Sequence, residues 1–501
     1  MATDTALLEE AALPGGPERV ILCGHVGDHA LPADDAQPLR FSRWQPNRNV
    51  TLKIGTIHQA MWRPVPPAFE DLIDIAVYVY CADQAIPRRD RDAGAAWRRR
   101  LHFRIPVRQP EQWAEPRVTA ALTDVLSFLS EDEYHFEFVP LTRSEPFPNS
   151  FTFSDEVDPI DVEEVMLFSG GLDSLAFAVQ EAVIDRRRVA LINHRSTPKV
   201  GRRHARLMDG LRRHAAGTPL LHVPVPINKD RRFCRESTQR SRSFVYLALG
   251  ATFAQMIGLY RLRFYENGVV SMNLPPAPQI VGARATRTTH PRVIAGFSAL
   301  LSAIAGRRFD VENRFLWTTK TEVVRLLAEA GCAELIPWST SCAQTRAATR
   351  ALPHCGVCSQ CIDRRFAVLA AGQEQAEPTT DYGVDLLTGA RAELADRTLI
   401  GAYFDHWRLF RDGEPDRTNG PGPLLHTFPG GGTSAGLPAG GPRGWRPTHV
   451  RTPSSPCPCC DRGCRCGLRP ARAAPATARV PADLLAPSCG GAWPGGRARH
   501  L

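Results

Sequence analysis

The sequence predicts an α/β protein whose centre is a doubly wound parallel sheet. Three observations lead to this fold class. Short apolar runs alternate with amphipathic helical segments over residues 163–372, a Ser-Gly-Gly turn joins the first run to a helix, and four cysteines with metal-ligand spacing follow. Alternating strands and helices are typical of parallel sheets. We expect a β-rich α+β domain over residues 1–160, the sheet domain over 161–412 and a disordered tail over 413–501.

Length and composition are those of an ordinary globular protein. The 501 residues suffice for two or three domains, and 43% of them are hydrophobic and 23% charged. No run of 18 apolar residues occurs, so we expect no membrane span. The first ten residues are acidic and lack the basic and then apolar layout of a secretory signal, which favours a cytoplasmic location.

The net charge of +9 comes mainly from the end of the chain. Residues 414–501 contain 11 arginines against four acids, so the rest of the chain is close to neutral. A basic nucleic-acid surface would need its charge on a folded domain. We therefore expect no direct nucleic-acid binding.

The pattern of residues 1–160 predicts the β-rich α+β domain. Apolar side chains alternate with other residues over 73–79, 101–105 and 134–138, which predicts three strands. Pro106 confines the second of these strands to a sheet edge or to its own end. An apolar stripe over 118–129 predicts a helix. Because no catalytic cluster is present in the pattern, we expect a lid, a dimerisation surface or a docking surface for a partner.

The central region predicts four strands of a parallel sheet. They cover 165–168, 189–193, 220–225 and a run that ends at 263–268, with helices over 204–214 and 244–259. In such sheets ligands bind beyond the carboxyl ends of the strands. The side chains to consider there are those of Ser169, Asn193, His194, Glu266 and Asn267.

The turn after the first strand has the chemistry of a phosphate cradle. Its N–H groups and the positive end of the following helix dipole face one concavity, and glycine allows a close approach of the backbone to phosphate. The spacing differs from the GxxxxGK[ST] and GxGxxG loops. The alternative is an ordinary strand-to-helix turn. The nucleotide-binding residues that we predict are Leu167, Ser169, Gly170, Gly171, Leu172, Asp173, Ser174, Asn193 and His194.

Four cysteines have the spacing of a structural zinc site. Cys342, Cys355, Cys358 and Cys361 form a C-x12-C-x2-C-x2-C pattern, and the glycine after Cys355 suits a tight knuckle. Four thiolates meet the tetrahedral demand of Zn²⁺ and leave no open position for catalysis. A redox-active pair and an iron–sulfur cluster are the alternatives, whereas a disulfide is disfavoured because nothing indicates secretion.

The tail has the composition of a disordered segment. Residues 414–501 include 15 Gly and 15 Pro among 88, with no repeat. Six of the 14 cysteines of the chain also lie there, without paired CxxC knuckles or an apolar scaffold around them. A translated frameshift of a GC-rich reading frame is an alternative to native coding sequence, since the chain has 57 Arg but only four Lys.

Residues 169–174 resemble the SGGxDS signature of the PP-loop ATP pyrophosphatases, which cleave ATP between the α and β phosphates. With the cysteine motif about 170 residues later, residues 163–370 resemble the 7-cyano-7-deazaguanine synthase (QueC-like) family of queuosine biosynthesis. Lys320 begins a segment similar to the family's Lys-acid-hydrophobic helix. Arg364 matches its CxxCxxR ending, and Arg242 opens a segment similar to its Arg-Asn-x-Phe. The resemblance implies the PP-loop, or HUP-like, form of the sheet.

The chain also departs from this family. The family's enzymes lack the 160-residue N-terminal part and have a shorter gap after the first cysteine. Glu266-Asn267-Gly268-Val269 stands where the family has its Tyr-Pro-Asp-x-Arg segment near the substrate. The N-terminal extension resembles the defence-associated QatC-like branch, which implies attachment of a deazaguanine to a protein partner.

The resemblance implies an ATP-dependent C–N ligase with ATP, Mg²⁺ and Zn²⁺ as cofactors. Its reaction would adenylate 7-carboxy-7-deazaguanine or a close analogue, release AMP and pyrophosphate, and give an amide or nitrile with ammonia. The catalytic residues that we predict are Asp173 for Mg²⁺, Lys320 for phosphate charge and Arg242 for the substrate carboxylate. Asp173 is alternatively a helix cap and Lys320 a solvated side chain.

Two rival functions stay open. The activated acid could pass to a protein amine, with residues 1–160 holding the acceptor, or the chain could be a zinc-stabilised nucleotide-binding scaffold without activity. Further basic residues near the strand ends, Arg195, Lys199, Arg287 and His290, are weaker candidates for ligand contacts. The sequence leaves the oligomeric state open, a homodimer included.

Overall fold

The computed structural model describes residues 18–26, 38–43, 47–52, 65–88, 98–142, 162–195, 198–236, 240–272, 287–343 and 352–412. Contacts group the described residues into one compact unit. The predicted disordered tail and its cysteines lie outside the described residues.

The central sheet has six strands in the order β10-β9-β6-β7-β8-β3. Five of them are parallel, and β3 pairs antiparallel with β8. The chain starts in the middle at β6, runs outward through β7 and β8, and then returns to the other side of β6 with β9 and β10. This is the predicted doubly wound order. The strands are β3 (Val50–Leu52), β6 (Glu164–Leu167), β7 (Val189–Arg195), β8 (Leu220–Lys229), β9 (Arg261–Phe264) and β10 (Asp310–Asn313).

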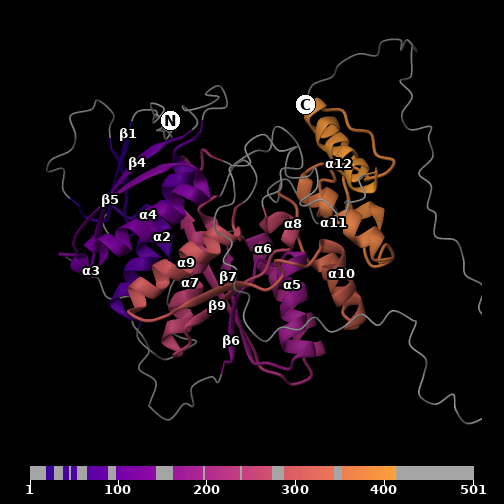
Figure 1. Ribbon diagram of the computed structural model, residues 1–501, viewed down its shortest axis with the longest axis horizontal. Coiled ribbons are helices and arrows are strands. Elements are labelled where there is room, and N and C mark those ends of the chain that lie inside the picture. The colour runs from indigo at the N-terminus through magenta and orange to yellow at the C-terminus, as the bar shows by residue number, and fades with distance from the viewer. Residues whose placement is uncertain are drawn as a thin grey trace, which may run out of the picture. The chain divides into compact units, whose positions relative to one another are not determined.

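Alternating side chains of the strands are buried on opposite faces of this sheet. On β6, Val165 and Leu167 belong to one core cluster, whereas Met166 and Phe168 belong to another. Helices cover both faces, which explains why the central strands β6 and β7 are mainly apolar. One face packs against α7 (Arg242–Met256) and α9 (Pro291–Ala305), and the other against α5 (Leu172–Val179), α6 (Pro198–His214) and α10 (Lys320–Glu329), as Figure 1 shows.

The N-terminal part is a second parallel sheet, so the predicted β-rich α+β architecture is wrong. Its four strands have the order β2-β1-β4-β5, and every described pairing among them is parallel. Pro106 lies in the central strand β4, one residue before its end and beyond the stretch that pairs with β1, so it costs the ladder no bond to that neighbour. The elements are β1 (Glu18–Cys23), β2 (Leu39–Phe41), β4 (Arg100–Val107), β5 (Glu133–Pro140), α2 (Pro67–Ala85), α3 (Pro110–Ala114) and α4 (Pro116–Ser130).

Residues 73–79, predicted as a strand, form the middle of helix α2. Seventeen of the 19 residues of this helix are buried, including Asp74 and Tyr78 between the apolar positions. A helix that is buried all round has no apolar stripe, and its β-branched residues then imitate strand alternation. Pro67 at its first position is compatible with a helix start.

The two sheets share one core. Helix α2 packs against α7 and α4 against α9, and a single apolar cluster extends from Ile21 of β1 to Val311 of β10. Strand β3 of the N-terminal part also forms the edge of the central sheet. The division of the chain near residue 160 into independent domains stays a prediction.

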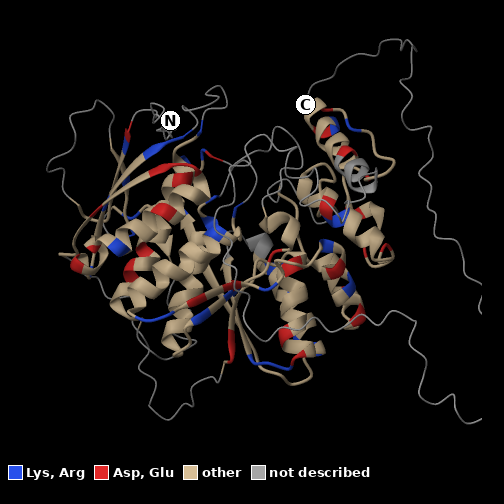
Figure 2. Cartoon of the chain, viewed as in Figure 1, with Lys and Arg blue, Asp and Glu red and all other residues tan. Residues whose placement is uncertain are grey.

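The described part of the chain ends in a helical region that carries the cysteines. It comprises α11 (Ser359–Ala370) and α12 (Leu394–Asp412), and a short helix α8 (Gly268–Ser271) lies after β9. Shorter helical turns cover Gln180–Ile184, Arg231–Phe233, Ala333–Trp338 and Thr379–Asp381. Acidic and basic residues are interspersed over the described elements (Figure 2). Among the described helices none is both long and apolar enough to cross a membrane.

Candidate functional site

The glycine turn lies at the carboxyl end of β6 and opens helix α5. Gly170 has a φ of +76°, a conformation that glycine adopts at little cost. A β-carbon at this position would lie 2.3 Å from Nε2 of His204, so no other residue fits without displacing that ring. Gly171 is the residue before the first turn of α5. The turn is therefore held in one shape by its neighbours, and its backbone is free of side chains at both glycines.

The hydroxyls of the turn bond to one another and to its backbone. Ser169 Oγ lies 3.2 Å from Ser174 Oγ and accepts a hydrogen bond from the Gly171 N–H at 3.3 Å. The Ser174 hydroxyl donates to the Gly171 carbonyl at 3.1 Å. Leu167 and Leu172 are buried in the core, so their side chains do not face a ligand. Of the predicted cradle residues, the serines, the glycines and Asp173 supply the polar groups.

His204 is a site residue that the sequence reasoning missed. Its Nδ1 lies 3.1 Å from Asn193 Oδ1, and its Nε2 lies 3.1 Å from the Ser169 carbonyl. Asn193 in turn donates to the Phe168 carbonyl at 2.6 Å. Burial lowers the pKa of His204 to about 4, so the ring is neutral at pH 7. This network joins the ends of β6 and β7. His204 lies in the following helix, α6, and no sequence motif around it indicates this contact.

Asp173 and Lys320 form an ion pair beside the turn. The Lys320 ammonium lies 2.9 and 2.8 Å from the two carboxylate oxygens, and Asn267 Nδ2 donates to Oδ2 at 3.0 Å. Both side chains of the ion pair are about nine-tenths buried. Asn267 follows β9 and Asp173 follows β6, the two neighbouring strands between which the order of the sheet reverses. Ligands of open α/β sheets bind at this kind of point.

Helix α10 holds Lys320 in place through its own cap. Thr319 accepts a hydrogen bond from the Glu322 N–H at 3.3 Å, and Glu322 accepts from the Thr319 N–H at 2.7 Å. This capping box fixes the first turn, of which Lys320 is the first residue. Lys320 is thus a buried, paired side chain and not a solvated one.

Glu266 adds a second carboxyl group near the ion pair. Burial raises its pKa to about 7, although the Thr289 hydroxyl, which donates to it at 2.6 Å, opposes the shift. Asp173 offers the kind of carboxylate that Mg²⁺ takes, once the Lys320 ammonium and the Asn267 Nδ2–H, which donate to its oxygens in this structure, give way to the ion. The donor set is therefore compatible with the predicted magnesium ion.

His194 lies in the last residues of β7, and Arg242, the first residue of α7, lies close to it. The Arg242 guanidinium donates to the Tyr246 hydroxyl at 3.2 Å, and no described carboxylate pairs with it. His194 is fully buried, and its Nε2 lies 3.4 Å from the Ile227 carbonyl. Burial, together with the positive charge of Arg242, lowers the pKa of His194 to about 3. Both predicted residues therefore belong to the strand-end region, next to rather than within the glycine turn.

The four predicted metal ligands converge. The sulfur atoms of Cys342, Cys355, Cys358 and Cys361 all lie within 4.8 Å of one another, and those of Cys355 and Cys361 are 3.8 Å apart. Tetrahedral zinc with Zn–S bonds of about 2.3 Å requires sulfurs about 3.8 Å apart. The cluster can therefore hold a metal ion such as zinc.

Hydrogen bonds among these four thiols shift their pKa values in opposite directions. Hydrogen bonds with Cys355, which raises the pKa, and with Cys358 and Cys361, which lower it, bring the pKa of Cys342 to about 6. The bonds among the four thiols lower the pKa of Cys355 but raise those of Cys358 and Cys361. All four can ionise together when a divalent ion balances their charge.

Residues around the cysteines hold the knuckle rigidly. Gly356 has a φ of +81°, and a β-carbon there would lie 1.9 Å from the Val384 carbonyl oxygen. Arg364, fully buried, pairs with Glu377 and donates to Ser339 Oγ at 2.9 Å. The sequence indicated Gly356 and Arg364, but Glu377, 13 residues beyond its partner, was not recognisable from spacing.

The metal centre and the glycine turn are connected through one residue. The Thr340 N–H donates to the Gly170 carbonyl at 2.9 Å, and Arg203 donates to the Thr340 hydroxyl at 2.6 Å. Cys342 lies two residues further along. The segment that enters the metal centre therefore also supports the turn.

The weaker candidates for ligand contacts do not join this site. Arg287 donates to Glu131 and to the Phe128 carbonyl of α4, and His290 caps α9 by accepting from the Arg292 N–H at 3.1 Å. The side chains of Arg195 and Lys199 lie outside the described residues.

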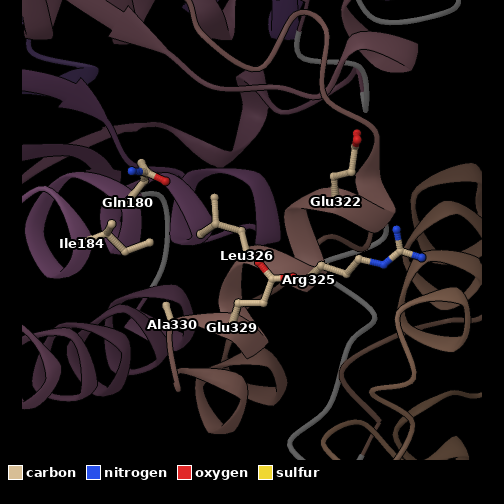
Figure 3. A pocket seen from close by; sticks show the side chains of 7 residues that line it. All are labelled: Gln180, Ile184, Glu322, Arg325, Leu326, Glu329 and Ala330. Carbon is tan, nitrogen blue, oxygen red and sulfur yellow. The ribbon is translucent and has the colours of Figure 1, made fainter. Parts of the chain in front are cut away.

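A groove of about 450 Å³ lies at the far end of helix α5 (Figure 3). Gln180 and Ile184 line it from one side and residues of α10 from the other, with Leu326 pointing between them. None of its lining residues belongs to the predicted site. We regard the strand ends as the better candidate, because the buried polar groups converge there.

The described geometry thus brings Asp173, Lys320 and the glycine turn together, with Arg242 and His194 beside them and the cysteines behind the turn. Comparison with protein-family models and with curated proteins finds no match to this chain.

Proposed function

We propose that this chain is an ATP-dependent C–N ligase that adenylates a 7-deazaguanine carboxylate. The observation that carries the proposal is the buried Asp173–Lys320 pair beside the glycine turn, at the point where the strand order reverses. The Asp173 carboxylate can hold Mg²⁺, and the Lys320 ammonium together with the backbone N–H groups of the turn can neutralise phosphate charge. The SGGxDS resemblance adds the PP-loop mode of cleavage, and its combination with the cysteine motif adds the deazaguanine acid.

The chemistry assigns a role to each group. A carboxylate oxygen of the acid attacks the α phosphorus of ATP, pyrophosphate leaves, and an acyl adenylate results. Ammonia then attacks the acyl carbon, and AMP departs with the former carboxylate oxygen to leave an amide. A second activation of the amide oxygen by ATP would give the nitrile. Lys320 and the N–H groups of the turn would balance the charge on the phosphates.

Two ions would complete the enzyme. Asp173 would hold Mg²⁺, which supplies charge neutralisation at the phosphates when bound. The four cysteines would hold Zn²⁺, which serves the fold because no coordination position stays open. When Mg²⁺ and ATP bind, Asp173 would turn to the ion, and Lys320 would pair with a phosphate group in its place.

The main proposal and its alternative differ in the amine that accepts the activated acid. In the alternative, the adenylate passes to an amine of a protein partner, as the resemblance to the defence-associated branch implies. The extensive core shared between the N-terminal part and the sheet favours a role of that part in the reaction, for either acceptor. A scaffold without activity would bind ATP and form no AMP.

The test uses purified protein with ATP, Mg²⁺, ammonia and 7-carboxy-7-deazaguanine, analysed by mass spectrometry. Release of AMP with an amide or nitrile would support the ligase. Formation of AMP with only a trapped adenylate would favour a protein acceptor. Absence of AMP would contradict the adenylation.

Asp173→Asn tests the assigned magnesium residue. The change keeps the shape of the side chain but removes its charge, so we expect AMP formation to fall by about a hundredfold or more. Metal content should stay close to that of the unchanged protein, whereas the melting temperature should fall, because the buried Lys320 ammonium loses its charge partner. Asp185→Asn, at a partly exposed carboxylate after the π-helical turn, serves as the control. Turnover retained in Asp173→Asn would refute the role of Asp173.

A further inference from the structure

Helix α2 of the N-terminal part reaches the strand-end region of the central sheet. Its Tyr80 ring packs edge-on against His194, with centroids 5.5 Å apart and planes at 88°. On its other side His194 faces Tyr246 of α7, with centroids 6.1 Å apart. One turn further along α2, Gln84 Oε1 accepts a hydrogen bond from the Lys229 ammonium at the end of β8. We call Tyr80, Gln84, His194, Lys229, Arg242 and Tyr246 the α2 cluster.

The α2 cluster carries two positive charges without a described counter-charge. The Lys229 ammonium lies 5.3 Å from the centre of the Tyr80 ring, and the Arg242 guanidinium 5.4 Å from that of Tyr246. Neither cation forms an ion pair with any carboxylate in the described ranges. Tyr80 contacts both His194 and Lys229, and Tyr246 contacts both His194 and Arg242, so the two cations lie around the same imidazole ring. Such an arrangement is stabilised by an anion.

His194 adds a hydrogen-bond acceptor between these cations. Because its Nε2 faces the Ile227 carbonyl, the neutral ring carries its hydrogen there and leaves a lone pair on Nδ1. Nδ1 is buried and has no partner among the described residues. An unpaired buried acceptor is costly, so a donor of a ligand is expected at this atom. A ligand for the α2 cluster thus has an anionic group, an N–H donor and flat faces for the aromatic rings.

A second contact fixes α2 to the start of α7. Asp83 accepts hydrogen bonds from the N–H of Ser241 at 3.2 Å and from its hydroxyl at 2.9 Å. Asp83 itself is buried and paired with Arg99 and Arg88. Arg242 is the next residue after Ser241, so this contact with the N-terminal part fixes the position of the Arg242 backbone.

We propose that helix α2 supplies a wall of the acid-binding site, and that the α2 cluster binds a planar heteroaromatic carboxylate. The carboxylate would lie between Lys229 and Arg242, and a ring N–H would donate to His194 Nδ1. The proposal rests on the proposed function only in taking this acid to be the one that is adenylated. It gives the N-terminal part a specific task, the recognition of the acid.

The test measures binding in the absence of turnover. Calorimetric titration of the full chain with 7-carboxy-7-deazaguanine, without ATP, is compared with 7-deazaguanine, which lacks the carboxylate. We expect Lys229→Gln and Arg242→Gln each to weaken binding of the acid about tenfold or more, and to leave binding of the uncharged base within about threefold. Tyr80→Leu should weaken binding of both ligands, because both lose the contact with the aromatic ring.

Controls separate the proposal from general effects of charge and folding. Arg232→Gln removes an exposed positive charge close to Lys229 in sequence and should bind the acid like the unchanged protein. Tyr80→Phe keeps the ring and should therefore bind both ligands like the unchanged protein. Equal affinity of the unchanged protein for acid and base would overturn the proposal, as would equal binding by Lys229→Gln and Arg232→Gln.

The outcomes also separate this proposal from the proposed function. Weaker binding of Mg·ATP in Lys229→Gln or Arg242→Gln, with the acid unaffected, would assign the α2 cluster to phosphate and refute it as an acid site. Binding of the acid by the cluster without formation of AMP would overturn the adenylation and leave the acid site standing. Formation of AMP, with binding of the acid unaffected by substitutions in the α2 cluster, would support the adenylation and overturn the acid site.

Discussion

At the scale of single residues, the site depends on close contacts of the backbone. The carbonyl of Ser169, the ring of His204 and the amide of Asn193 form one network around Gly170. The sequence predicted the glycines because the SGGxDS pattern is local. It could not predict His204, since the contact joins residues 35 positions apart and a histidine within a helix has no distinctive spacing.

Gly170→Ala should disrupt the turn, and Gly217→Ala provides a matched control. Both glycines have positive φ, +76° and +89°, so both substitutions carry the backbone cost of about 1–2 kcal/mol. Only at Gly170 does the added methyl group meet the His204 ring, whereas nothing lies within 4 Å at Gly217.

We therefore expect Gly170→Ala to lower the free energy of unfolding by at least about 1 kcal/mol more than Gly217→Ala, in urea denaturation. Affinity for Mg·ATP, measured by calorimetry, should fall about tenfold or more in Gly170→Ala alone. Equal behaviour of the two variants would show that His204 yields to the methyl group.

At the scale of elements, the central sheet was the predictable part. Its strands are short, apolar and followed by turns, so 189–193 and 220–225 were predicted close to β7 and β8. Helix α2 was mistaken for a strand because burial on all sides erased its stripe. The three-residue strand β3 was not predicted, since its pairing with β8 lies far away in sequence.

Helix α7 approaches the sheet closely at Gly250. A β-carbon there would lie 2.6 Å from a methyl group of Leu167 and 2.7 Å from one of Leu262, on β6 and β9. Gly250→Ala should therefore cost about 1–3 kcal/mol of unfolding free energy. Gly401→Ala, in α12 with nothing within 4 Å, should instead stabilise by up to about 1 kcal/mol.

Denaturant titrations measure the change in unfolding free energy for both substitutions, provided that the slope of this free energy against denaturant concentration is unchanged. A neutral or stabilising effect of Gly250→Ala would mean that the two leucines can move aside, and that α7 is less tightly packed than its contacts indicate.

At the scale of the whole molecule, the metal centre and the strand-end site are one assembly. Chelation of the metal, or Cys358→Ser, should lower the melting temperature by at least about 5 °C and weaken binding of Mg·ATP. The physical reason is that Thr340 supports Gly170 from a segment that the cysteines anchor. Elemental analysis, thermal melting and calorimetry measure the three quantities.

Cys234→Ser is the control for the metal prediction, because Cys234 is an exposed cysteine outside the cluster. It should keep metal, melting temperature and nucleotide affinity. A Cys358→Ser protein with one zinc per chain and normal stability would refute the four-thiolate site.

The hydrogen bond from Thr340 to Gly170 also has a consequence for the maturation of the protein. A newly made chain that has not yet acquired its metal would lack the support on which the turn depends, and so would bind nucleotide poorly. On the proposed function, metal uptake would then be a licensing step that precedes the use of ATP.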